Sequence, residues 1–338
     1  MEKLTLKQHI LFFLLLIFCF FLCLCVGSVP IAFKDSMDIL RNALKGINQN
    51  SANASILIHV RLPRVLSTGL VGAALAISGA AMQGLLQNPL ADGGTLGTSS
   101  GAALGAVLSI ALGLTFPGFP LAGTAIMAIL FSFISLIIVM FVSFSVDRNF
   151  SNNTIILMGV IFSMFAGSLI SLIMAFSGEK LRSIAFWTMG SLAGSGFPNV
   201  ALMLVALVPA SFVLMLHARE INAFSLGENE ALHIGVNVKK VKIAILIAVS
   251  CLIGTAVSIG GSIGFVGLIV PHALRIRHSG NYKKLLPMCL YSGAIFLMLA
   301  DLLARTVLSP VELPIGVVTS FVGAIAFVII YAGRKKIA

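Results

Sequence analysis

Long segments with almost no charge follow one another along the whole chain. An α-helix needs about 20 apolar residues to cross the hydrocarbon of a bilayer, where free backbone polar groups find no partners. With 59% hydrophobic and 10% charged residues, the chain is also unlike a soluble globule, which holds about 45–50% apolar and about 25% charged residues. We therefore expect an all-α, polytopic helical membrane protein whose residues 1–338 form a single transmembrane domain. About ten transmembrane helices are predicted, the eighth being short and rich in glycine: residues 10–27, 65–86, 95–114, 119–146, 154–175, 197–216, 243–260, 263–274, 285–304 and 313–332.

The first apolar segment has two interpretations. Lys3 and Lys7 precede residues 10–27, as basic residues precede the apolar core of a secretory signal. The segment is long for a signal, and no cleavage site of small residues closes it cleanly, so an uncleaved first span is favoured. Ten spans then leave both termini in the cytoplasm, together with most of the 22 lysines and arginines, as the positive-inside rule requires. The net charge of +11 is therefore mainly a topology signal, and nucleic-acid binding is not needed to explain it.

The residue types that carry enzyme chemistry form no recognisable site. The five cysteines lie in apolar segments without a CxxC pair, so neither a zinc site nor a disulfide framework is predicted. The six histidines show no His-Glu-x-x-His spacing, and no Gly-x-x-x-x-Gly-Lys-Ser/Thr loop is present. We expect no catalytic site, no metal site and no cofactor in this chain, so that any ATP hydrolysis belongs to another subunit.

A polar island at 218–240 interrupts the apolar pattern. Ser225-Leu-Gly-Glu228 fits a capping box, in which the hydroxyl and the carboxylate would satisfy amide donors at the start of a helix. Gly235 supplies a left-handed stop. A capped helix outside the lipid suggests a docking element for a partner, and an ordered loop is the alternative.

Several basic residues lie on the outer side, against the usual bias. Arg61 and Arg64 are three residues apart at the mouth of a span, so both guanidinium groups share one helix face. Arg305 follows Asp301 by four residues near the outer end of the ninth span. One interpretation is an intrahelical salt bridge with Arg305 reaching the interface. The other is a ring of arginines on the outer surface that receives carboxylates from a soluble partner, which forked guanidinium groups suit.

Three further runs are more specific than composition. Gln87-Asn-Pro-Leu-Ala-Asp92 should stop a helix and start a turn, and Asp92 or Thr95 can cap the next span. The glycines of the run from Gly260 to His272 suggest a broken or tightly packed helix near a pathway. The third run joins Ala-Asp-Leu-Leu-Ala-Arg, which ends at Arg305, to Glu-Leu-Pro-Ile-Gly.

Together these runs resemble the permease subunits of bacterial ABC importers for iron–siderophore complexes, haem and cobalamin. The resemblance covers about residues 55–333 and keeps the family's order: Arg-Leu-Pro-Arg, Asn-Pro-Leu-Ala-Asp, Ser-Leu-Gly-Glu, Gly-Phe-Val-Gly-Leu-Ile-Val-Pro-His, Ala-Asp-Leu-Leu-Ala-Arg and Glu-Leu-Pro-Ile-Gly. No single motif would suffice, but the ordered set is highly specific. Gly93 departs from the family, which usually has proline there, and this should loosen the turn.

The resemblance implies ten spans, a dimer of two identical or related permeases, two cytoplasmic ABC ATPases and an external substrate-binding protein. It implies a cytoplasmic coupling helix at about 225–235 that docks on the ATPase, with Ser225, Leu226, Gly227, Glu228, Glu230, Ala231, Leu232 and Gly235. It implies docking of the binding protein by Arg61, Arg64 and Arg305. Two stretches should form a gate in the cytoplasmic half of the pathway, with Asn88, Pro89, Asp92, Gly264, Gly267, Pro271 and His272.

The leading hypothesis is therefore a multi-pass permease of the bacterial cytoplasmic membrane that imports iron–siderophore complexes. Haem or cobalamin import is the alternative within the family, since nothing in the residues separates these cargoes. A secondary transporter driven by an ion gradient is the alternative of another class. Such transporters usually hold ionisable residues at mid-membrane, where Asp301 is the only obvious candidate here.

Overall fold

The fold is described by a computed structural model that covers residues 5–27, 29–47, 51–114, 122–148, 150–277 and 280–334. Every regular element in these residues is helical, which confirms the expected all-α architecture. In chain order the elements are α1 (Leu6–Cys25), α2 (Phe33–Leu44), α3 (Ala52–Ser55), η1 (Ile56–Arg61), α4 (Leu62–Leu85), η2 (Gly94–Leu96), α5 (Thr98–Leu112), α6 (Ala122–Val146), α7 (Asn152–Phe176), η3 (Gly178–Lys180), α8 (Leu181–Thr188), α9 (Phe197–Leu216), α10 (Ala218–Phe224), α11 (Glu228–His233), α12 (Val238–Gly260), α13 (Val266–Arg277), α14 (Tyr282–Thr306) and α15 (Ile315–Arg334).

Each of the ten predicted spans coincides with an apolar helix, but three of these helices are short. By length and composition, 7 helices can cross a membrane: α1, the continuous run Ala52–Leu85, α6, α7, α9, α12 and α14. The other three, within α5, α13 and α15, are apolar helices of 10–17 residues. The polytopic helical fold is therefore confirmed, while the number of full-length spans in the described residues is lower than expected. The second span also starts earlier than predicted, because η1 continues into α4 without a break.

The centre of the bundle is built from α4 and α12, which bury the largest shares of their apolar windows, 78% and 72%. Glycines let their neighbours approach closely: a side chain at Gly72 would collide with the backbone of Gly293 on α14, and one at Gly79 with the backbone of Gly267 on α13. Small residues have this role in helix packing within membranes. In contrast, only 17% of the corresponding windows of α1 and α7 is buried, as expected of helices that face lipid or another subunit.

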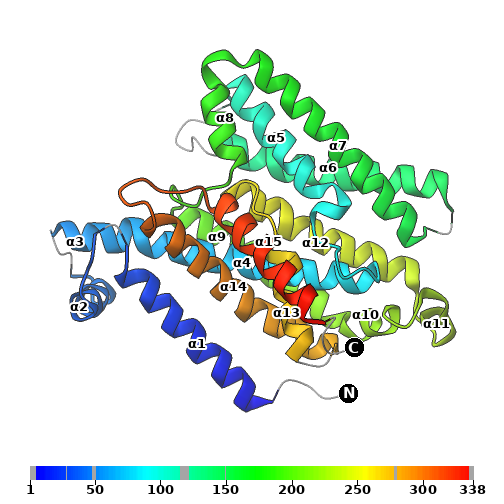
Figure 1. The fold of residues 1–338 in the computed structure, drawn as a ribbon, viewed down its shortest axis with the longest axis horizontal. Helices are drawn as coiled ribbons and strands as arrows, with labels where there is room; N and C mark the ends of the chain where they lie inside the picture. The colour runs from blue at the N-terminus through cyan, green and yellow to red at the C-terminus, as the bar shows by residue number, and fades with distance from the viewer. Residues whose placement is uncertain are drawn as a thin grey trace.

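The helices of the centre run between two ends of the molecule (Figure 1). Helices α10 and α11 lie at one end, beside the start of α1 and the end of α15, and we call this the α11 end. Helices α2 and α3 lie at the opposite end, the α2 end. Each end carries one of the charged clusters that the sequence singled out, so the two clusters cannot form a single site.

Candidate functional site

The polar island at the α11 end folds into the two short helices α10 and α11, so the predicted helix is confirmed but its start is not. The capping box between Ser225 and Glu228 is wrong. The Ser225 hydroxyl donates to the carbonyl of Ile221 at 3.1 Å, because Ser225 still belongs to the last turn of α10. Gly227, with φ +132°, turns the chain into α11, and this positive φ is a conformation that favours glycine. Gly235 ends the segment at φ +86°, as predicted.

The exposed face of this segment is partly apolar. Leu226, Leu232 and Ile234 are 77%, 55% and 67% exposed, and Glu230 is exposed among them. Ala231 is fully buried and holds α11 to the rest of the chain. Exposed leucines on a short helical segment at the end of a membrane protein form a surface suited to another protein.

Lys242 anchors α11 to the bundle. Its ammonium group donates to the Glu228 carboxylate at 2.7 Å and to the backbone carbonyl of Phe150 at 2.9 Å. The Lys242 side chain is 1% exposed and that of Glu228 is 24% exposed. A buried ammonium therefore joins three segments, namely α11, the first turns of α12 and the α6–α7 connection. Apart from the excess of charged residues in the island, no sequence pattern indicated this contact.

Helix α10 is fixed to α14 by a second set of polar contacts. The side-chain amide of Asn222 donates to Asn281 at 3.0 Å and its oxygen accepts from the Tyr282 backbone at 2.9 Å. A side chain at Gly84 would collide with Ile221 and with the ring of Tyr282, so α4 also packs tightly here. The two short helices are thus held to α4, α12 and α14, and movement of α10 and α11 must involve these helices.

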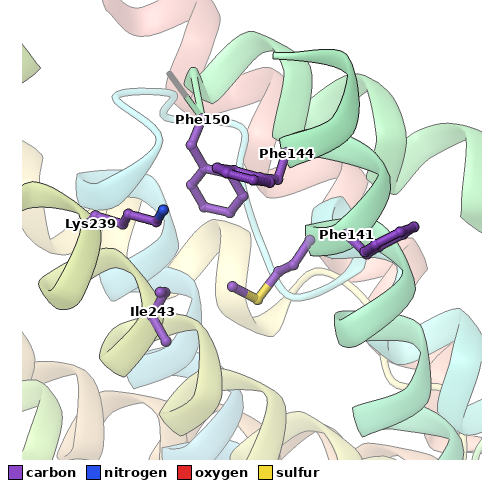
Figure 2. A pocket seen from close by; sticks show the side chains of 6 residues that line it. Phe141, Phe144, Phe150, Lys239 and Ile243 are labelled. Carbon is purple, nitrogen blue, oxygen red and sulfur yellow. The ribbon is translucent and has the colours of Figure 1, made fainter. Parts of the chain in front are cut away.

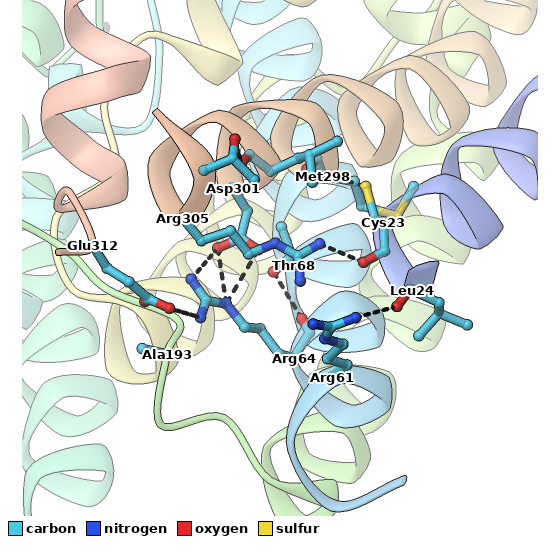
Figure 3. A network of polar contacts seen from close by, with 12 residues as sticks. Cys23, Leu24, Arg61, Arg64, Thr68, Ala193, Met298, Asp301, Arg305 and Glu312 are labelled. Carbon is cyan, nitrogen blue, oxygen red and sulfur yellow. Dashed lines mark hydrogen bonds and ion pairs between the residues drawn. The ribbon is translucent and has the colours of Figure 1, made fainter. Parts of the chain in front are cut away.

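The arginines at the α2 end form a buried network (Figure 3). Arg64 binds both oxygens of Asp301, with contacts of 2.8 to 3.1 Å, and both oxygens of Glu312 at 3.0 Å. Arg305 approaches Asp301 at 3.6 Å and donates to the carbonyl of Cys23. Arg61 donates to the carbonyls of residues 24 and 25, which end α1, and of residue 29 just beyond it. The network therefore connects α1, α4, α14 and the segment before α15.

These contacts change the prediction for the arginines. Arg61, Arg64 and Arg305 are only 5%, 6% and 3% exposed, so the expectation of guanidinium groups displayed on the outer surface is wrong. Of the alternative, the Asp301–Arg305 salt bridge within α14 is confirmed, whereas Arg305 does not reach the surface and Arg64 makes the closer contact with Asp301. The member with solvent access is Glu312, whose side chain is 37% exposed. Whether the three arginines contact a partner stays a prediction.

The connection after α4 turns back into the bundle. Asn88 accepts from the backbone of Leu90 at 2.9 Å, and Pro89 lies next to it on the surface. The Asp92 carboxylate accepts from the backbone N–H of Gly94 at 2.9 Å. The Thr95 hydroxyl in turn accepts from the backbone N–H of Asp92 at 2.9 Å. Asp92 and Thr95 thus stabilise the turn that leads into η2, and the predicted cap of the next span is wrong, because α5 begins after Gly97 without a side-chain cap.

Gly93 is a site of close packing. A side chain there would collide with the end of Ile253 on α12. The backbone, at φ −67° and ψ −23°, is one that any residue can adopt. Glycine at this position thus makes room for the end of the neighbouring isoleucine side chain, whereas the turn itself would accept another residue, which differs from the loosening that we expected.

The glycine-rich run after α12 is a broken helix, as predicted. Residues 261–265 are not helical, and α13 begins only at Val266. Gly190 accepts from the Ile315 backbone at 3.0 Å, and Gly260 accepts from the Ser191 backbone at 2.9 Å. A side chain at Gly316 would collide with the carbonyl of Ser262. Three separate segments, at residues 190–191, 260–262 and 315–316, therefore meet here with their backbones in contact. We call residues 260–265, where the helix is broken, the joint.

The joint lies at the end of α12 that is remote from α11, and its place on the cytoplasmic side of the pathway stays a prediction. Gly260 is the last residue of α12, a helix of 23 residues, which at 1.5 Å per residue is long enough to cross the hydrocarbon. The joint is thus far from the α11 end, and only α13 leads back toward that end. A Cβ added at Gly264 would make only an ordinary contact, at 3.7 Å, with the Ser320 hydroxyl. Pro271 and His272 lie further along α13, where the centres of the His272 and Phe327 rings are 5.6 Å apart.

Comparison with known proteins gives one consistent result. The FecCD transport family matches residues 15–332. The uncharacterized ABC transporter permease protein YvrB of Bacillus subtilis is 45% identical over 285 residues, which cover 83% of this chain and 80% of that protein. The hemin transport system permease protein HmuU of Yersinia pestis is 35% identical over 301 residues, covering 88% of this chain and 87% of that protein. A solved metal-chelate type ABC transporter in an inward-facing conformation is 33% identical, with a TM-score of 0.84 over 97% of this chain and 99% of the other.

Proposed function

Since this chain belongs to the FecCD transport family and is a permease of the ABC importer type, we propose that it imports an iron–siderophore complex across a bacterial cytoplasmic membrane. The observation that carries the proposal is the likeness, over nearly the whole chain, to a solved transporter of the metal-chelate type. Haem is the second candidate cargo, because the hemin permease HmuU is similar over most of its length.

In this proposal the chain forms half of a permease dimer and the free energy comes from two ABC ATPases. The α11 end faces the cytoplasm, in agreement with the lysines and arginines of the polar island. The ATPase contacts α11 through the exposed side chains of Leu226, Glu230 and Leu232. Because Lys242 joins Glu228 to α12, a displacement of α11 is passed into the bundle.

At the α2 end the proposed partner is a substrate-binding protein. Docking through carboxylates has to reach guanidinium groups that are already paired inside the chain. Arg64 is buried, but it can be reached by displacing Glu312, which is the exposed member of the network. We propose that a carboxylate of the binding protein competes with Glu312 for Arg64. This exchange keeps the arginine neutralised, and it frees the segment that leads into α15.

The test is a transport assay with the assembled importer. The tagged chain is purified from its native membrane with the subunits that accompany it, reconstituted into vesicles and supplied with its binding protein. We expect uptake of a ferric siderophore that requires internal ATP and is unaffected when proton and sodium gradients are collapsed. Preferred uptake of haemin or cobalamin would replace the proposed cargo, whereas uptake that needs an ion gradient and not ATP would reject the importer class.

A further inference from the structure

A cavity of about 230 Å³ lies between α6 and α12, near the α11 end (Figure 2). The last turns of α6, the first turns of α12 and Phe150 in the α6–α7 connection form its walls. It is lined by Met140, Phe141, Phe144, Phe150, Lys239 and Ile243. The walls are thus apolar except for one ammonium group.

Lys239 is the charged residue that lines this cavity, and no ion pair offsets its charge among the described residues. Its ammonium group lies 4.5 Å from the centre of the Phe144 ring. Lys242, one turn further along α12, is in contrast paired with Glu228. Asp147, on the α6–α7 connection, accepts from the Ser151 backbone at 3.1 Å.

The position of the cavity relates it to the membrane boundary. Helices α6 and α12 are both candidate spans, and the cavity lies where α6 ends and α12 begins. Phe141 and Phe144 are 72% and 42% exposed, so the aromatic wall opens to the outside of the chain. An apolar crevice with a cation at its rim, at the level where a helix leaves the hydrocarbon, matches a phospholipid with an anionic head group. Lysine stems are suited to this depth because they lie along apolar surface while the ammonium reaches the interface.

We propose that this cavity is a binding site for an anionic phospholipid of the leaflet at the α11 end. The phosphate lies on the ammonium of Lys239, and the first part of an acyl chain lies between Phe141, Phe144 and Ile243. The site shares Phe150 with the anchor of α11, because the Phe150 carbonyl accepts from Lys242. The lipid therefore supports the connection that holds α11. This assignment does not depend on the cargo of the importer.

The test uses the purified protein, with the subunits that accompany it, in nanodiscs. These contain trace phosphatidylglycerol or phosphatidylcholine with a photoreactive group on the acyl chain. We expect adducts on residues 140–150 and 239–243 from phosphatidylglycerol, and few from phosphatidylcholine. Lys239→Gln should lower the yield about fivefold, which corresponds to about 1 kcal/mol for one basic residue at an anionic surface. Lys240→Gln is the matched control, since Lys240 is the exposed neighbour that does not line the cavity, and it should leave the yield unchanged.

Filling the cavity provides a second variant. Ile243→Trp should abolish the adducts while leaving the charge of Lys239 in place. Equal losses in Lys239→Gln and Lys240→Gln would show a diffuse basic surface and overturn the site. Equal adducts from the two lipids would show an apolar crevice without head-group selection. Adducts that form on the permease alone but are lost when the ATPase is bound would show that the ATPase covers this surface. Either result would also overturn the proposal.

Discussion

The anchor between Glu228 and Lys242 allows a sharp test, because its two partners differ in burial. The side chain of Lys242 is 1% exposed and that of Glu228 is 24% exposed. Glu228→Ala leaves a buried ammonium with the Phe150 carbonyl as its remaining hydrogen-bond partner. Lys242→Met removes the buried charge itself and leaves a carboxylate that can turn to water. Removal of the acid should therefore cost more than removal of the base.

The magnitudes follow from this difference. Breaking a buried ion pair by removing one partner costs about 3–5 kcal/mol. Since Glu228 is partly exposed, we expect about 2–3 kcal/mol for Glu228→Ala. Lys242→Met loses one hydrogen bond to a backbone carbonyl and keeps most of the packing volume, so we expect about 1–2 kcal/mol. The double variant should lie close to Lys242→Met alone, with a coupling energy of about 2 kcal/mol between the two positions.

The measurement is the thermal unfolding midpoint of the purified permease in one detergent, together with its association with the ATPase. The expected order of midpoints is wild type, then Lys242→Met together with the double variant, then Glu228→Ala. Glu230→Ala is the control: it is exposed on α11, so it should leave the midpoint unchanged and weaken only ATPase association. Additive losses in the double variant would refute the anchor, because independent side chains show no coupling.

Three further predictions concern packing and charge. Gly93→Ala should destabilise the protein by about 1–3 kcal/mol through overpacking, and Ile253→Val in the same chain, which removes the colliding methyl group, should recover part of this loss in thermal unfolding. Gly264→Leu should block uptake in vesicles at the broken helix, while pull-down shows that the ATPase still assembles; normal uptake would place this residue outside the pathway. Asp301→Asn should lower the thermal midpoint strongly, by about 3–5 kcal/mol in stability, because it leaves two buried arginines without their shared carboxylate. Glu312→Gln, at a side chain that is 37% exposed, should cost less than about 1 kcal/mol, and equal effects of the two changes would contradict the unequal burial.

The difference between local and distant information is clearest in the two charged clusters. Arg64 meets Asp301 across 237 residues of chain and Glu312 across 248. Spacing along the sequence suggested only the local pair, Asp301 with Arg305. Exposure of an arginine is likewise a property of what packs over it, so a break in the positive-inside pattern could not distinguish a surface group from a buried one. Ser225 shows the same limit, since its hydroxyl can serve the helix before it or the one after it.

What the sequence determined by itself is the membrane class, the apolar helices, the stop at Gly235 and the break after Gly260. These features depend on composition and on backbone preferences within a few residues, which the order of residues states directly. Only the tertiary structure decided that Lys242 supports α11, that the arginines are internal and that Gly93 makes room for Ile253. Each of these outcomes depends on which distant helix lies alongside, and close packing of helices, unlike hydropathy, is not a local property of the chain.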